Sequence, residues 1–186
     1  MKHKITRIIT ITVSAIILSA CSAQVPRYSS SADNVNVIRN ISTKVNIGDI
    51  TATTPTKSVM CRLANPVIMP NDETINEYIE NAFIEEFKMA NIYDKNSNIT
   101  ISGNLNKTTA SSGMTDGHWT FDMTVKSSNS KSFNTIYKHE YSGSFVGGVA
   151  CRENMPDEFE PAVEGLIQVI LMDKRFQELL NSAPLS

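Results

Sequence analysis

The chain has 186 residues and a formal net charge of −2, with 17 Lys and Arg against 19 Asp and Glu. Hydrophobic residues make up 41% of it and charged residues 19%, which is enough apolar material for one domain with a core. The acidic balance argues against nucleic acid as a partner and against membrane binding through a polybasic surface.

The first 20 residues have the pattern of a secretory signal. Three basic residues lie within the first seven positions, and an apolar run of eleven residues, Ile8–Leu18, follows them. This run has the length of a signal h-region and is too short to span a membrane, which needs about 20 residues. The closing residues Leu18-Ser19-Ala20-Cys21 resemble the lipobox of bacterial lipoproteins. That resemblance implies cleavage before Cys21 and acylation of its sulfur and its new amino group.

The lipobox also predicts how the chain is organised. We expect a lipoprotein signal peptide over 1–20, a flexible tether over 21–33 and a single periplasmic α+β domain over 34–186. Two or more acyl chains anchor a protein stably to a membrane. In the Gram-negative sorting pattern an Asp after the acylated cysteine favours the inner membrane, so Ser22 predicts the periplasmic face of the outer membrane. Removing the signal lowers the number of Lys and Arg from 17 to 14 against 19 Asp and Glu, a net charge of −5.

The three cysteines divide into one for the lipid and one pair. Cys61 and Cys151 are an even pair in an oxidising compartment, which favours a disulfide. Closing a loop of about 90 residues stabilises a fold by ~4.5 kcal/mol at most, and 2–4 kcal/mol is typical. The alternatives are two free thiols or a metal pair. Without a CxxC motif or a nearby His cluster, however, two cysteines make a poor zinc site.

Hydrophobic periodicity predicts strands and helices in alternation. In chain order we expect one or two strands over 35–42 and 44–50, an extended edge or loop segment over 58–69, a helix over 72–91, strands over 99–105, 119–125 and 133–145, and a helix from 160 onward. The fold class is therefore α+β, an antiparallel sheet of about four to five strands with two helices packed on one face.

Local signals support several of these elements. Thr74-Ile75-Asn76-Glu77 fits a capping box at the start of the first helix. The polar segment 127–130 predicts a hairpin turn, and the Ser-, Thr- and Gly-rich segment 108–117 predicts a loop. Asp173-Lys174 marks a place where the last helix can break into two pieces.

Many short stretches resemble a set of small, uncharacterised proteobacterial lipoproteins. They are Lys44-Val45-Asn46-Ile47-Gly48-Asp49, Met60-Cys61-Arg62, Pro66-Val67 with Pro70, Tyr78-Ile79, Lys88-Met89-Ala90-Asn91-Ile92-Tyr93-Asp94, Ile101-Ser102-Gly103-Asn104-Leu105, Val125-Lys126-Ser127-Ser128-Asn129, Ala150-Cys151 and Pro161-Ala162-Val163. Both cysteines of the pair recur in that family pattern, which also implies a bridge. The family implies no activity. The order of elements is more loosely similar to envelope-assembly lipoproteins such as the lipopolysaccharide-assembly lipoprotein, but fold does not carry function.

An aromatic row is the main candidate for a ligand or partner surface. Phe133, Tyr137, Tyr141 and Phe145 share one face of the strand over 133–145, and Trp119 lies in the preceding strand. If the row faces away from the helices, it is an exposed binding patch. If it faces the helices, it belongs to the core. We favour the core, because the helices need an apolar sheet face to cover.

Catalytic and metal-binding motifs are weak. Asp116, His118 and His139 are the candidates for a metal or acid–base group, but they lack HxH or HExxH spacing. Ser142-Gly143-Ser144 falls in a predicted strand and lacks the context of a nucleophile elbow. We therefore predict no catalytic residue, no metal and no cofactor, and we do not expect an enzyme.

The functional prediction is a lipid-anchored envelope protein that acts without catalysis. It is held to the membrane at Cys21 and works as an accessory or interaction module, with another envelope protein as the expected partner. The alternative is a binder of a small apolar or lipidic ligand between the sheet and the helices. An envelope hydrolase is the third hypothesis, and converging His, Asp and Ser side chains in one cleft would support it.

Overall fold

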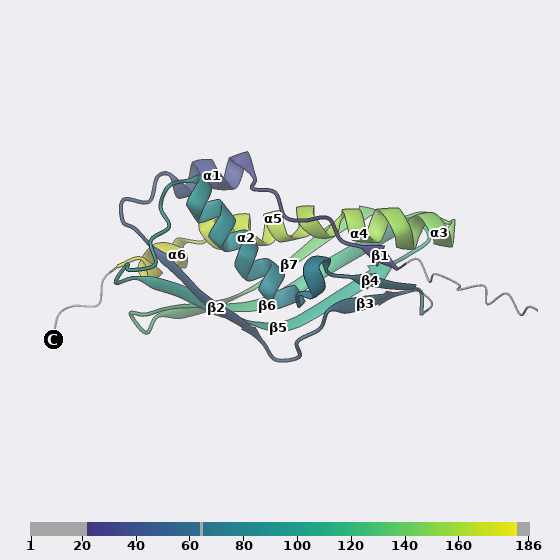
Figure 1. Ribbon diagram of the computed structural model, residues 1–186, viewed down its shortest axis with the longest axis horizontal. Coiled ribbons are helices and arrows are strands. Elements are labelled where there is room, and N and C mark those ends of the chain that lie inside the picture. The colour runs from purple at the N-terminus through teal and green to yellow at the C-terminus, as the bar shows by residue number, and fades with distance from the viewer. Residues whose placement is uncertain (1–21, 64, 182–186) are drawn as a thin grey trace, which may run out of the picture.

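The computed structural model describes residues 22–63 and 65–181, and it has two sheets and a layer of helices in that part of the chain (Figure 1). The strands are β1 (Ala23–Gln24), β2 (Asn46–Ala52), β3 (Ser58–Cys61), β4 (Asn65–Ile68), β5 (Thr100–Ser112), β6 (Asp116–Ser127) and β7 (Ser132–Ser142). The helices are α1 (Ala32–Ile38), α2 (Ile75–Met89), α3 (Gly147–Val149), α4 (Met155–Asp157), α5 (Phe159–Met172) and α6 (Lys174–Leu179), with a 3-10 turn η1 (Pro70–Asp72) and a π turn η2 (Ala150–Asn154).

The larger sheet has the strand order β2-β5-β6-β7, and α1, α2 and α5 lie over one of its faces (Figure 1). β5, β6 and β7 form an antiparallel meander, whereas β2 runs parallel to β5. The smaller sheet has the order β1-β4-β3, with β1 parallel to β4. The α+β character is confirmed, but the prediction of one antiparallel sheet with two helices is wrong. Parallel pairing of β2 needs a crossover, and α2 with the small sheet supplies it.

The helix α2 is the element that the sequence predicts best. Thr74 accepts a hydrogen bond from the backbone N–H of Glu77, and the Glu77 carboxylate accepts one from the backbone N–H of Thr74. The predicted capping box is therefore present. The predicted break in the last helix is also confirmed, because Asp173 leaves helical geometry and its carboxylate accepts from the N–H of Arg175 to start α6.

The segment 32–38 is a helix rather than the predicted strand. Val35 and Ile38 are buried together with Asn34 against α2 and α5. The apolar residues of this short segment fit both a period of two and helical spacing, so alternation alone does not distinguish the two structures. Packing between two larger helices decides in favour of the helix.

The segment expected as a flexible tether is packed against the domain from its first described residues. Ala23 pairs with Val67 of β4, and Val25 is only 2% exposed. The Tyr28 hydroxyl then donates to the carboxylate of Glu86 on α2 at 2.6 Å. The prediction of a tether over 21–33 is therefore wrong from residue 23 onward. Ala23 and Val25 are buried by the domain although the segment as a whole is small and polar. The predicted signal peptide and Cys21 lie outside the described residues.

The strand β5 continues through the segment expected as a loop. Its ladder with β6 runs as far as Ser112 opposite Gly117, with a bulge between Leu105 and Lys107. The Ser and Thr residues of this stretch line the less buried half of a long hairpin, where polar side chains face water. The predicted turn at 127–130 is confirmed, since Ser130 is left-handed and its N–H donates to the carbonyl of Ser127.

Candidate functional site

The predicted aromatic surface lies under the helices. Trp119, Phe133 and Tyr141 are buried, at 0%, 5% and 7% exposure, and Tyr137 is half-buried. The Trp119 indole N–H donates to the carbonyl of Met155 at 3.0 Å. Trp119, Phe133 and Tyr141 belong to the core and Tyr137 packs against it, so these four side chains do not form the exposed patch that was the other alternative.

Two glycines make room for the tyrosines of this row. A Cβ at Gly117 would come within 2.3 Å of the Tyr141 ring, and a Cβ at Gly165 would come within 2.1 Å of the Tyr137 hydroxyl. Tyr141 can therefore lie flat over β6 and donate to the carbonyl of Ser111. Burial raises the pKa of Tyr141 to about 12 and raises the pKa of Tyr137 as well, as expected for phenols removed from water.

The candidate acid–base residues do not converge. His139 pairs with Glu158 at 2.8 Å, whereas His118 sits opposite Glu140 in the β6–β7 ladder and Asp116 is exposed at the start of β6. Within residues 22–63 and 65–181 no three His, Cys, Asp or Glu side chains are grouped to hold a metal ion. The same residues contain no helix that is long and apolar enough to cross a membrane.

The predicted disulfide is present between Cys61 and Cys151. Cys61 is the last residue of β3, and Cys151 lies in η2, where the chain returns from β7 toward α5. Both cysteines are fully buried. The bond therefore ties the small sheet to the segment that follows the large sheet.

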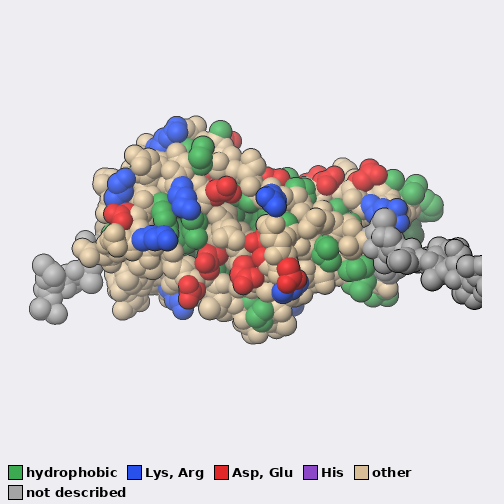
Figure 2. Space-filling model, in the orientation of Figure 1, with side chains coloured by type: hydrophobic (Ala, Val, Ile, Leu, Met, Phe, Trp, Pro, Cys, Tyr) green, Lys and Arg blue, Asp and Glu red, His purple; other side chains and the backbone are tan. Residues whose placement is uncertain are grey.

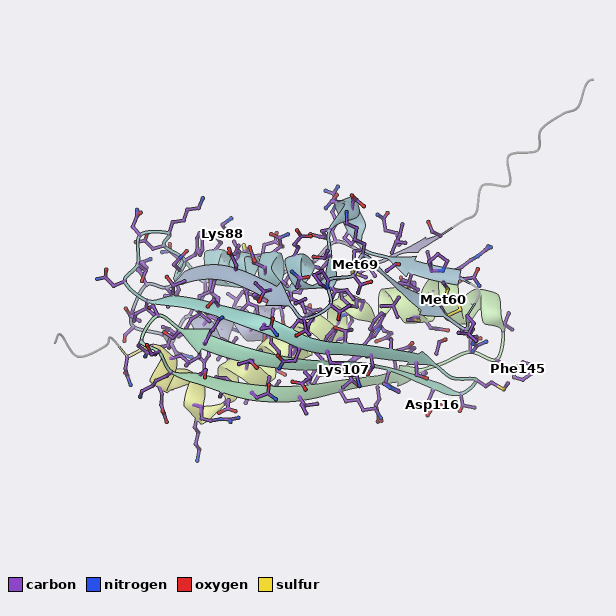
Figure 3. All side chains as sticks on the ribbon, turned by 90° about the horizontal axis from the view of Figure 1, so that it is seen from below. Met60, Met69, Lys88, Lys107, Asp116 and Phe145 are labelled. Atoms are coloured by element: carbon purple, nitrogen blue, oxygen red, sulfur yellow. A yellow bond between two sulfur atoms is a disulfide. The ribbon has the colours of Figure 1, made fainter. Side chains whose placement is uncertain are left out.

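Beside the disulfide lies a cluster of exposed apolar side chains, which we call the loop end. It comprises Met60, Leu63, Met114, Phe145 and Val146. Met60 lies in β3, and the other four come from the turns between β3 and β4, between β5 and β6, and after β7. Figure 3 shows Met60 and Phe145 at the same end of the molecule. Leu63 is 94% exposed and Phe145 78%. Among the described residues, five of the eight large hydrophobic side chains that are exposed lie in this cluster, which makes it a candidate interaction surface.

Arg62 holds the three turns of the loop end together. Its guanidinium donates to the carbonyls of Ser112 at 3.1 Å, Gly113 at 2.7 Å and Ser144 at 2.5 Å, with a longer bond to Phe145. A planar guanidinium offers five donors in a fixed fork, so it can serve several carbonyls at once. The turns are therefore fixed relative to one another although their apolar tips face water.

The backbone at the tip of the β3–β4 turn is strained. Arg62 and Leu63 have φ values of 47° and 57°, a left-handed conformation that is unfavourable for residues with a side chain. The Cys61 disulfide on one side and the hydrogen bonds of Arg62 hold this geometry. Strain of this kind gathers at functional positions, and here it points Arg62 inward while leaving Leu63 exposed.

A buried carboxylate fastens the N-terminal segment to the helices. Glu86 of α2 is fully buried, and its Oε1 accepts from the Tyr28 hydroxyl, the Ser31 N–H at 2.9 Å and the Asn34 side-chain amide at 3.3 Å. Burial and the neighbouring Glu86 carboxylate raise the pKa of Tyr28 far above its ordinary range. Three donors on one carboxylate oxygen explain why the segment before α1 is packed rather than free.

The space between the sheet and α2 is filled. The cavity there, lined by Phe83 and Met123 among others, has a volume of only about 10 Å³, less than one water molecule occupies. A larger hollow of about 210 Å³ between α1, α5 and β7 is lined mostly by polar groups, including Asp33, His139 and Glu164. Burial and neighbouring carboxylates raise the pKa of Glu164.

The loop end escaped sequence analysis because its members lie in different segments that were assigned to loops or to the end of a strand. Phe145 was placed on the strand over 133–145, but β7 ends at Ser142. A usable signal existed, since Met114 and Phe145 are large apolar residues close to turn glycines. These residues lie near Leu63 only through tertiary contacts, and hydrophobic periodicity in the sequence does not predict such contacts.

No family model matches the chain, and no curated protein matches it. A similar solved structure is the crystal structure of protein XCC0632 from Xanthomonas campestris, assigned to the DUF330 family model. The two chains are 10% identical, the match covers 70% of this chain and 84% of that chain, and the TM-score is 0.48. A likeness at this level shows neither a shared family nor a function.

Replacing Arg62 tests whether it holds the loop end together. Arg62→Ala leaves carbonyls of two other turns, at 112–113 and 144–145, without their donor, and we expect it to lower the free energy of unfolding by roughly 2–3 kcal/mol. Amide hydrogen exchange should rise in 112–115 and 143–146. Arg62→Lys is the matched control, because it keeps the positive charge but lacks the planar guanidinium with its several donors. It should restore only part of the protection from amide hydrogen exchange. Unchanged exchange in both segments of Arg62→Ala would contradict the assignment.

Proposed function

We propose that the protein is a lipid-anchored envelope protein that acts, without catalysis, as an accessory module binding another envelope component. The anchoring rests on the Leu18–Cys21 motif in the sequence. The Cys61–Cys151 disulfide supports a compartment outside the cytosol, because stable disulfides form in oxidising surroundings such as the bacterial periplasm. The outer membrane, with the domain on its periplasmic face, remains the location that Ser22 predicts.

The observation that carries the binding role is the free edge of β7. The closing hydrogen bond of its hairpin, from the Ser127 N–H to the carbonyl of Lys131, sets which residues of β7 face β6. Because the two directions alternate along an antiparallel strand, the backbone groups of Asn134, Ile136, Lys138 and Glu140 point away from the sheet. Among described residues, a single long bond from Arg175 to the carbonyl of Asn134 reaches them.

The opposite edge of the same sheet is capped by α2 at Ile50. On β2, the N–H of Ile50 donates to the Glu80 carboxylate at 2.8 Å, and the carbonyl of Ile50 accepts from the Asn76 amide at 2.9 Å. Proteins commonly block exposed edges in this way to prevent unwanted pairing. The long free edge of β7 is suited to pairing with an added strand from a partner. In this mode of binding, main-chain hydrogen bonds supply the affinity.

The filled core gives no support to the alternative, a binder of an apolar ligand between sheet and helices. A ligand site usually needs a cavity of about 300 Å³ or more, whereas the cavity between the sheet and α2 measures about 10 Å³. The larger hollow near His139 is polar and does not suit an apolar molecule. The hydrolase hypothesis also lacks its expected cluster, because Asp116, His118 and His139 lie apart.

Fatty-acid labelling tests the anchor. In cells given a labelled fatty acid, the wild-type chain should carry label and Cys21→Ala should carry none, because the acylated sulfur and amino group both belong to that residue. Cys61→Ser with Cys151→Ser, which removes the other thiols, should still be labelled. Label that persists on Cys21→Ala would overturn the lipobox assignment.

A proline on the free edge tests the binding role. Ile136→Pro removes an outward N–H without removing a bond to β6, so the fold should survive while strand addition is blocked. Ile136→Thr keeps the N–H and suits a strand, which makes it the matched control. With in-cell crosslinking, we expect an envelope-protein adduct in wild type and Ile136→Thr that is lost in Ile136→Pro. An adduct that survives the proline in a folded variant would rule out pairing at β7.

A further inference from the structure

We propose that the loop end inserts into the lipid surface that holds the anchor, so that the domain stands directly on the membrane rather than on a tether. This inference rests on the proposed acylation of Cys21. It goes beyond it by naming a second membrane contact, made by Leu63, Met114 and Phe145, and an orientation of the domain.

The short stretch of chain between Cys21 and Ala23 requires that an acylated Cys21 stay close to the domain. Ala23 is buried and paired with Val67, and Cys21 precedes it by two residues. Each residue spans at most about 3.6 Å, so the Cα atoms of Cys21 and Ala23 lie within about 7 Å of each other. Acyl chains on Cys21 therefore bring the start of β1 to the level of the lipid headgroups.

The start of β1 lies at the loop end. β1 runs parallel to β4, with Ala23 opposite Val67 and Gln24 opposite Ile68. The beginning of β1 therefore lies on the side of β4 where β4 begins, and the turn with Arg62 and Leu63 precedes β4. Figure 1 places β1, β3, β4 and α3 together at this end of the molecule. An anchor at Cys21 would therefore bring the loop end close to the membrane.

The chemistry of the loop end suits a lipid surface. Its members project from separate turns instead of lining a groove, and Figure 2 shows hydrophobic side chains gathered at the same end. Burying one large apolar side chain is worth roughly a tenfold change in partitioning or more. The five members carry no charge, and the nearby Arg62 is engaged with carbonyls. Insertion should therefore not require anionic lipid.

The tips are held in place before they meet the membrane. The disulfide, the fork of Arg62 and the left-handed backbone of Leu63 fix the three turns relative to one another. Groups that are already ordered lose little conformational entropy on binding.

Lipids with brominated acyl chains test the insertion, because bromine quenches tryptophan fluorescence within the bilayer. The full lipidated protein, carrying Phe145→Trp, is reconstituted in phosphatidylcholine vesicles with and without brominated chains. We expect loss of most of the emission that the new tryptophan adds, with a shift to shorter wavelength. The native Trp119 is fully buried and serves as an unquenched reference. Adding anionic lipid should leave the quenching unchanged.

Ile136→Trp is the matched control, because Ile136 is a large apolar residue that is 67% exposed on the sheet, away from the loop end. Its added emission should be unaffected by bromine. Leu63→Trp gives a second reporter should Phe145→Trp fail to fold. Protein that floats with the vesicles while neither loop-end reporter is quenched would overturn the insertion but leave the anchor intact. Protein that neither floats nor carries fatty acid would overturn the anchor and the insertion together.

Discussion

The bond between Cys61 and Cys151 is the constraint on which the loop end depends. It joins the last residue of β3 to η2, two segments 90 residues apart in the chain, and a cross-link of this span restricts the unfolded chain strongly. The next residue, Arg62, can then reach the turns after β5 and β7. Covalent and hydrogen-bonded links together hold exposed apolar side chains in fixed positions, which burial alone would not do.

Because the N-terminal segment is packed against the domain, a lipid anchor at Cys21 would be joined to the domain by a short link and not by a flexible tether. A long tether would leave the domain free to turn above the membrane, and its surfaces would have no fixed direction. With β1 paired to β4 and Glu86 fastening Tyr28 and Ser31, the proposed anchor at Cys21 would restrict the orientation of the domain. In the proposed orientation, the end of β7 at Ser142, which leads toward Phe145 of the loop end, would lie nearer the membrane than its start at Ser132, and its free edge would face the periplasm.

Sequence patterns predicted those elements whose signals are local. The capping box at Thr74, the strict alternation from Trp119 to Val125 and the break at Asp173 each depend on a few neighbouring residues. The helix at 32–38 and the packed segment before it depend on partners far along the chain, including Glu86 and Val67. The disulfide was predictable because only two cysteines remained. In the loop end, large apolar residues beside turn glycines were the only local signal, and that signal does not show that the separate turns meet. The parallel pairing of β2 was missed because alternation indicates a strand but not its neighbour.

Neutron reflectometry of the lipidated protein on a supported bilayer tests the central claim most directly, since it measures protein density along the membrane normal. The account predicts that protein density begins within the headgroup region, without an intervening water layer. It also predicts that this density extends outward by the long axis of the domain, with α6 and the β6–β7 turn farthest from the lipid. A water layer between headgroups and protein, or a domain lying flat on the membrane, would contradict the account.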